Sequence, residues 1–141
     1  MSAKLKTFVV AVFASVLAFF AAVAMAHHSA AQFDFGQRVT IEGTVKGFNV
    51  TNPHTWATVE LTDAKRGTRE AQYEGHSASH FYRAGYTRDM VKVGDKIAIL
   101  IAPRRDGEDG GFIQAFTVNG KTVGFGGLSP ETGKRTDAAS E

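Results

Sequence analysis

The 141-residue sequence contains no cysteine, so neither disulfide bonds nor thiolate metal ligands can support its fold. Stability must therefore come from packing, and any metal ion would be held by imidazole, carboxylate, backbone or terminal-amine groups. The sequence also lacks the motifs of a serine-hydrolase elbow, a phosphate-binding loop and a dinucleotide fold. Nothing in the residue pattern supports catalysis, and we expect that the protein is not an enzyme.

A concentrated basic face is missing as well. The formal net charge is +2, but two of the sixteen basic residues, Lys4 and Lys6, precede an apolar segment at the N-terminus. Without them, 14 basic and 14 acidic residues remain, and basic residues cluster no further than pairs such as Arg104-Arg105. This distribution argues against a nucleic-acid partner, which requires a clustered basic surface.

The first 26 residues are predicted to be a cleaved signal peptide. Two lysines are followed by an apolar run over residues 8–26, and Ala24 and Ala26 supply the small side chains of a cleavage site. A retained membrane anchor is the alternative, because the run approaches the roughly 20 residues that span a bilayer. Cleavage would leave 115 residues, enough for one domain, in a periplasmic or secreted protein without membrane contact.

Residues 27–125 are predicted to form an all-β domain with a small helical content. Apolar and polar residues alternate in strand-like segments, and turn residues separate these segments. The predicted strands cover residues 38–49, 56–61, 68–74, 96–102 and 112–118, and a short helix capped by Ser77 falls between the third and fourth. This order is that of a five-stranded, OB-like Greek-key barrel, with a compact β-sandwich as the alternative. Gly43 and Gly47 indicate a bulge or a close backbone approach within the first strand. Residues 126–141 are expected to be a disordered tail.

Histidine is the residue type in this chain that best suits a metal site. All five histidines follow the predicted cleavage site. Cleavage after Ala26 would expose the amine of His27, which could chelate Cu(II) together with its own imidazole, with His28 or His54 completing the site. Cleavage after Ala24 would make His27 the third residue, a position suited to square-planar Cu(II) or Ni(II). We therefore expect copper at His27, His28 and His54. The alternative is that the first two are polar residues of a frayed end.

The other histidines are more ambiguous. His54 follows the turn residues Asn52 and Pro53, and Trp56 could form an apolar wall beside it, but a turn histidine bonded to the backbone fits equally. His76 and His80 are four residues apart and could share a metal on one helix face, although solvent-exposed helix residues explain the same spacing.

A second function hypothesis needs no metal. An OB-like barrel can bind a periplasmic protein or a glycan on its strand face, and aromatic side chains would supply the contacts. The candidates for these contacts are Trp56, Phe48, Tyr73 and Phe81.

Several segments of the chain together resemble one known family. These are the opening His27-His28-Ser29, the turn Asn52-Pro53-His54-Thr55-Trp56 and the later Thr87-Arg88-Asp89. In them the chain resembles domain-of-unknown-function family 6152, an exported bacterial family, over about residues 26–123. The chain departs from the family pattern at Val50, where a tryptophan is expected, and at residues 76–78, where a Gly-Ser-Pro-like step is expected. The resemblance implies export and a small β-rich fold, but no established reaction.

Overall fold

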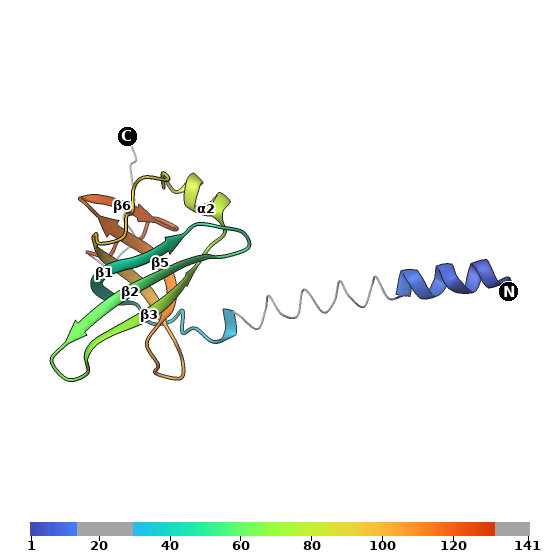
Figure 1. Ribbon diagram of the computed structural model, residues 1–141, viewed down its shortest axis with the longest axis horizontal. Coiled ribbons are helices and arrows are strands. Elements are labelled where there is room, and N and C mark those ends of the chain that lie inside the picture. The colour runs from blue at the N-terminus through green and yellow to red at the C-terminus, as the bar shows by residue number, and fades with distance from the viewer. Residues whose placement is uncertain (14–29, 132–141) are drawn as a thin grey trace. The chain divides into compact units, whose positions relative to one another are not determined.

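The computed structural model describes residues 1–13 and 30–131 and divides the chain into two units, Met1–Gln32 and Phe33–Glu141. In the first unit, residues 3–13 form a helix (Figure 1). Among the described residues, no helix is long and apolar enough to cross a membrane. His27, His28 and both candidate cleavage sites lie outside the described residues.

The second unit is a closed β-barrel with one short helix. Its described elements are β1 (Val39–Asn49), β2 (Thr55–Asp63), β3 (Gly67–Gly75), α2 (Ala78–Arg83), β4 (Lys96–Pro103), β5 (Gly111–Val118) and β6 (Lys121–Gly124). β1 pairs with β2 and β4, β2 with β3, and β4 with β5, all antiparallel. A parallel pairing of β3 with β5 closes the barrel, and β6 extends the sheet beyond β5. The predicted five-stranded, OB-like barrel, with its helix between the third and fourth strands, is confirmed.

The two glycines of β1 let this strand wrap closely around the barrel. A Cβ atom on Gly43 would lie 2.5 Å from both the carbonyl oxygen of Glu60 and a methyl group of Val59. Near Gly47 the pairing with β2 shifts by one residue, which is the mark of a β-bulge. Both forms of irregularity expected from the glycines are therefore present.

The bulge also changes which β1 side chains face the core. Before it, Val45 pairs with Val59, and after it, Phe48 pairs with Ala57. Val59 and Ala57 are both fully buried, so Val45 and Phe48 share the inner face although they are three residues apart. Phe48 packs against the core as a partly buried residue. An uninterrupted alternation would have placed Gly47 there instead.

The core fills the barrel and is covered at one end by α2 (Figure 1). Its largest fully buried side chains include Tyr73, Phe81, Phe116, Ile99 and Ile113. Phe81, the one buried side chain of α2, contributes to this packing from the helix. Tertiary packing therefore stabilises a helix of only six residues, which would be too short to form alone.

Ion pairs join the β2–β3 hairpin to the loop between β4 and β5. Arg69 donates from Nη2 to Oδ1 of Asp109 at 3.2 Å, and Arg66 donates from Nη1 to Oδ2 of the same carboxylate at 3.0 Å. Arg69 also pairs with Asp63. The hydrogen bond from Arg69 is the main cause that holds the pKa of Asp109 below its ordinary value. These contacts tie the two loops together.

The ordered part of the domain continues past Phe125, where we expected a tail to begin. Ser129 is buried, and the hydroxyl of Thr40 donates to the carbonyl oxygen of Pro130 at 2.9 Å. The segment that follows β6 is thus bound to β1. Residues 132–141 of the expected tail lie outside the described residues.

The close approach at Gly43 predicts a strong asymmetry between the two β1 glycines. Gly43→Ala should lower the free energy of unfolding by about 1–3 kcal/mol, because the added methyl group overpacks the β1–β2 contact. Gly47→Ala is the matched control, since its nearest neighbour, the hydroxyl of Thr58, would lie 3.7 Å away. Urea unfolding of both variants measures the difference. Equal stability of the two variants would contradict the packing described for β1.

Candidate functional site

The turn between β1 and β2 is bonded to the segment that follows β3. The amide of Thr55 donates to the carbonyl oxygen of His76 at 3.0 Å, and the amide of Ala78 donates to that of Thr51 at 3.0 Å. The hydroxyl of Thr51 in turn donates to the carbonyl oxygen of His54 at 3.1 Å. These backbone contacts bring His54 and His76 to the same end of the barrel, although 22 positions separate them in the chain.

His54 lies against a buried carboxylate. Its Nδ1 atom contacts Oε1 of Glu74, whose side chain is only 4% exposed. This is a close contact and not a well-aligned hydrogen bond, and among the described residues Nδ1 has no hydrogen-bond partner. Nδ1 itself is enclosed, while 32% of the His54 side chain as a whole is exposed.

His76 sits among aromatic rings. Its ring centroid lies 4.9 Å from that of Phe112 and 4.7 Å from that of Phe125, and it stacks on His80 at 5.2 Å. Burial is the main cause that lowers the pKa of His76, and the charges of His80 and His54 lower it further. His76 therefore stays neutral at neutral pH, the state in which an imidazole can bind a metal.

His80 is the exposed member of this histidine cluster, which we define as His54, His76 and His80. Its Nδ1 atom shares a hydrogen bond of 2.9 Å with the hydroxyl of Ser77. Ser77 is the N-cap residue of α2, as predicted, but its side chain makes no capping bond to the backbone. His76 precedes the helix, so the two histidines meet by stacking and do not share one helix face.

A short segment before β1 packs on the outside of the barrel next to this cluster. We call residues 33–37 the N-terminal strap. Phe33 is 3% exposed and its ring lies 5.6 Å from that of Phe112, while the amide of Asp34 donates to the carbonyl oxygen of Pro103 at 2.8 Å. Phe112 thus contacts the strap on one side and His76 on another.

The structure brings together some of the predicted metal ligands and leaves others untested. His54 lies in a cluster with His76 and His80, whereas His27 and His28 fall outside the described residues. Within residues 1–13 and 30–131, no three His, Asp or Glu side chains are arranged to hold a metal ion. His54 is therefore the one predicted ligand whose surroundings can be described.

The four aromatic residues predicted to contact a partner have different surroundings. Tyr73 and Phe81 are core residues, 1% and 0% exposed, and Phe48 packs against the same core. These three rings have a structural role that the expectation of a surface contact did not include. Trp56 is 44% exposed on β2 and alone among the four keeps a large exposed ring.

Glu74 and Phe112 are the site residues that sequence reasoning missed. Alternation along β3 assigns Tyr73 to the core and Glu74 to the outer face, where a carboxylate is unremarkable. Glu74 is buried because β3 pairs with β5 and brings Phe112 beside it. No local pattern in the sequence predicts this pairing between strands that are far apart in the chain.

These features define a class: a small closed β-barrel of the OB type, with a histidine cluster at one end beside a buried carboxylate. Residues 14–114 match a family of unknown function (DUF6152), and the chain belongs to this family. A comparison with curated proteins finds no match.

The environment of His76 predicts an unusual titration. Its ring should titrate below the ordinary histidine value of about 6.5, because burial penalises the imidazolium form. The unfolded chain then binds the proton more readily than the folded protein. This contribution to stability is fully present above about pH 6.5 and is lost as the pH falls below it.

NMR titration of the histidine ring signals measures this pKa. His80→Gln should raise the pKa of His76 because it removes a neighbouring positive charge. A titration midpoint of His76 at or above the ordinary value would contradict the description of the site.

Proposed function

We propose that the protein is a periplasmic or secreted copper-binding accessory protein that handles or delivers the metal and is not an enzyme. The observation that carries the proposal is the position of His54 at one end of the barrel, where its Nδ1 atom faces the buried carboxylate of Glu74. Imidazole nitrogen is a suitable ligand for copper, and a chain without cysteine has no thiolate to offer.

The remaining ligands of the proposed site come from the mature N-terminus. After cleavage at Ala26, His27 would supply a terminal amine and an imidazole to the same copper ion. His28 precedes Phe33 by five residues, a stretch that spans at most roughly 18 Å when fully extended. Phe33 itself is buried against Phe112, which also contacts His76.

Copper titration of the mature protein tests this function. Mass spectrometry first establishes the N-terminal residue, and His27→Ala and His54→Ala are then compared with the wild type. Each substitution removes a proposed nitrogen ligand. The affinity for Cu(II) should therefore fall by more than the roughly 10-fold to 100-fold typical of changes outside the ligand shell.

Two controls separate the proposed site from nonspecific binding by imidazole. His80→Ala removes the exposed histidine of the same cluster and should leave the affinity nearly unchanged, since Nδ1 of His80 is already engaged by Ser77. Acetylation of the amine of His27 keeps every side chain but removes the terminal amine as a ligand, and should also weaken binding strongly. Affinities unchanged by both His27→Ala and His54→Ala would refute the proposal.

The second candidate function is a metal-independent module that binds a protein or glycan on the strand face. The observation in its favour is that Trp56 and Phe35 remain 44% and 45% exposed on this barrel. Exposed aromatic rings of this kind are common in binding sites.

The single tryptophan separates the two functions. Under the copper proposal, Trp56→Ala should change the copper affinity by no more than a few fold, because the indole supplies no ligand nitrogen to the site. Under the alternative, the fluorescence of Trp56 should respond to glycan or peptide ligands in the presence of a metal chelator. A ligand response that persists in the chelator and is lost in Trp56→Ala would favour the second function.

A further inference from the structure

Glu74 is buried at a position where the strand pattern places an exposed residue. Its neighbour Tyr73 points into the core, so Glu74 points to the outside of the barrel, yet its side chain is only 4% exposed. Trp56 on β2 and Phe112 on β5 are its partners in the register on either side. Burying a carboxylate between such neighbours is costly unless polar groups or positive charge compensate it.

The contact of Glu74 with His54 has a direct chemical consequence. A neutral imidazole carries its single proton on one of two nitrogens, and an ionised carboxylate can only accept a hydrogen bond. Oε1 of Glu74 contacts Nδ1 without the alignment of a hydrogen bond, but the negative charge of an ionised carboxylate still favours the form of His54 that carries the proton on the facing nitrogen. The lone pair of the ring is then on Nε2.

We infer that Glu74 is a positioning residue of the site: it holds the ring of His54 and its proton so that the lone pair of Nε2 is available as a metal ligand. This inference rests on the proposed copper function and adds a residue to it. Metal-binding histidines commonly donate their other ring nitrogen to a carboxylate, which fixes the ring and makes the ligand more basic. Glu74 need not touch the metal.

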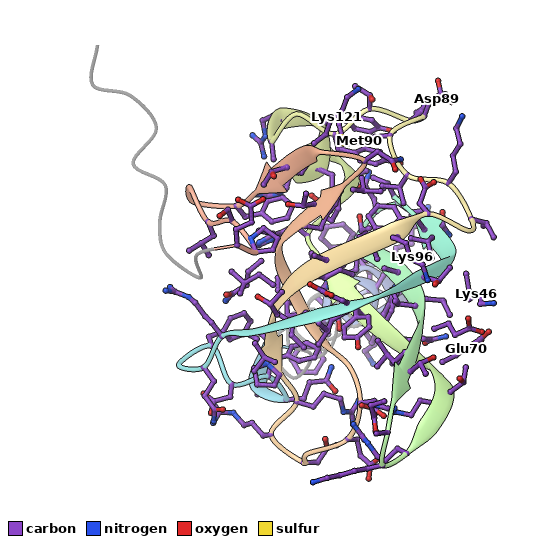
Figure 2. All side chains as sticks on the ribbon, turned by 90° about the vertical axis from the view of Figure 1, so that its left-hand side faces the viewer. Lys46, Glu70, Asp89, Met90, Lys96 and Lys121 are labelled. Carbon is purple, nitrogen blue, oxygen red and sulfur yellow. The ribbon has the colours of Figure 1, made fainter. Side chains whose placement is uncertain are left out.

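A surface carboxylate on the neighbouring strand provides the matched control. Oε2 of Glu60 on β2 lies 2.9 Å from Nζ of Lys46, and both side chains are about one-third exposed. Lys46 extends outward from the barrel (Figure 2). Glu60→Gln removes the same charge as Glu74→Gln but leaves the contact with His54 intact.

The first experiment needs no metal. Nitrogen NMR of the mature, copper-free protein, at a pH well above the ordinary histidine pKa, reports which ring nitrogen of His54 carries the proton. The wild type and Glu60→Gln should show the proton on Nδ1, and Glu74→Gln should shift it toward a mixture of both forms. If Glu74→Gln keeps the proton on Nδ1 as fully as the wild type, the inference is overturned.

The second experiment measures copper affinity in the same proteins. Glu74→Gln should weaken Cu(II) binding by roughly 10-fold to 100-fold, the usual effect of losing a carboxylate behind a histidine ligand. Glu60→Gln should not change it. In a His54→Ala background, Glu74→Gln should have no further effect, because the two residues act through one ligand. An undiminished loss in that background would assign Glu74 another role and overturn the inference.

Two further features keep the test decisive. Glu74→Asp retains a carboxylate if the glutamine variant folds poorly, and it should restore part of both the NMR signature and the affinity. If the wild-type protein binds no copper, the proposed function is refuted. In that case the NMR experiment alone would still decide whether Glu74 positions His54.

Discussion

The parallel contact between β3 and β5 is the constraint on which the rest of the structure depends. Only two residue pairs form it, Tyr73 with Gly111 and Glu74 with Phe112. A side chain at Gly110, directly before β5, would collide with the carbonyl oxygen of Gln72 on β3, which would lie 2.8 Å from its Cβ atom. The missing side chain therefore permits the approach of the strands. This one contact closes the barrel around Tyr73 on the inside and buries Glu74 on the outside.

The outer side of this contact connects three parts of the chain. Phe112 packs against Phe33 of the strap and against His76, while Glu74, its partner in the register, contacts His54. The strap, the β1–β2 turn and the segment before α2 thus meet around one pair of residues. The positions of His54 and His76 therefore depend on closure of the barrel, whereas His80 is carried by α2.

The sequence predicts those features that depend on local pattern. Strand boundaries follow from alternation and turn residues, and the irregularity of β1 follows from Gly43 and Gly47. The inward position of Phe48 could not be predicted, because a bulge shifts the alternation by one residue only when β2 is present to pair with it. The burial of Glu74 could not be predicted for the same reason. It depends on Phe112, which is 38 positions away in the chain and lies beside Glu74 only in the closed barrel. The turn residues before His54 identify it as a candidate ligand in the sequence. Nothing in the sequence identifies Glu74 as the carboxylate that contacts it.

The charge balance of the site explains why a cation is the natural ligand to propose. A carboxylate in a poorly hydrated position favours positive charge nearby, and the imidazole of His54, which contacts Glu74, can carry such charge. His76 resists protonation because it is buried among aromatic rings. A metal ion bound at Nε2 of His54 would place positive charge on the far side of the ring that contacts Glu74. This charge would stabilise the carboxylate while His76 stays neutral. Burial therefore keeps His76 in the neutral form at neutral pH, which is the form that copper binding by histidine requires.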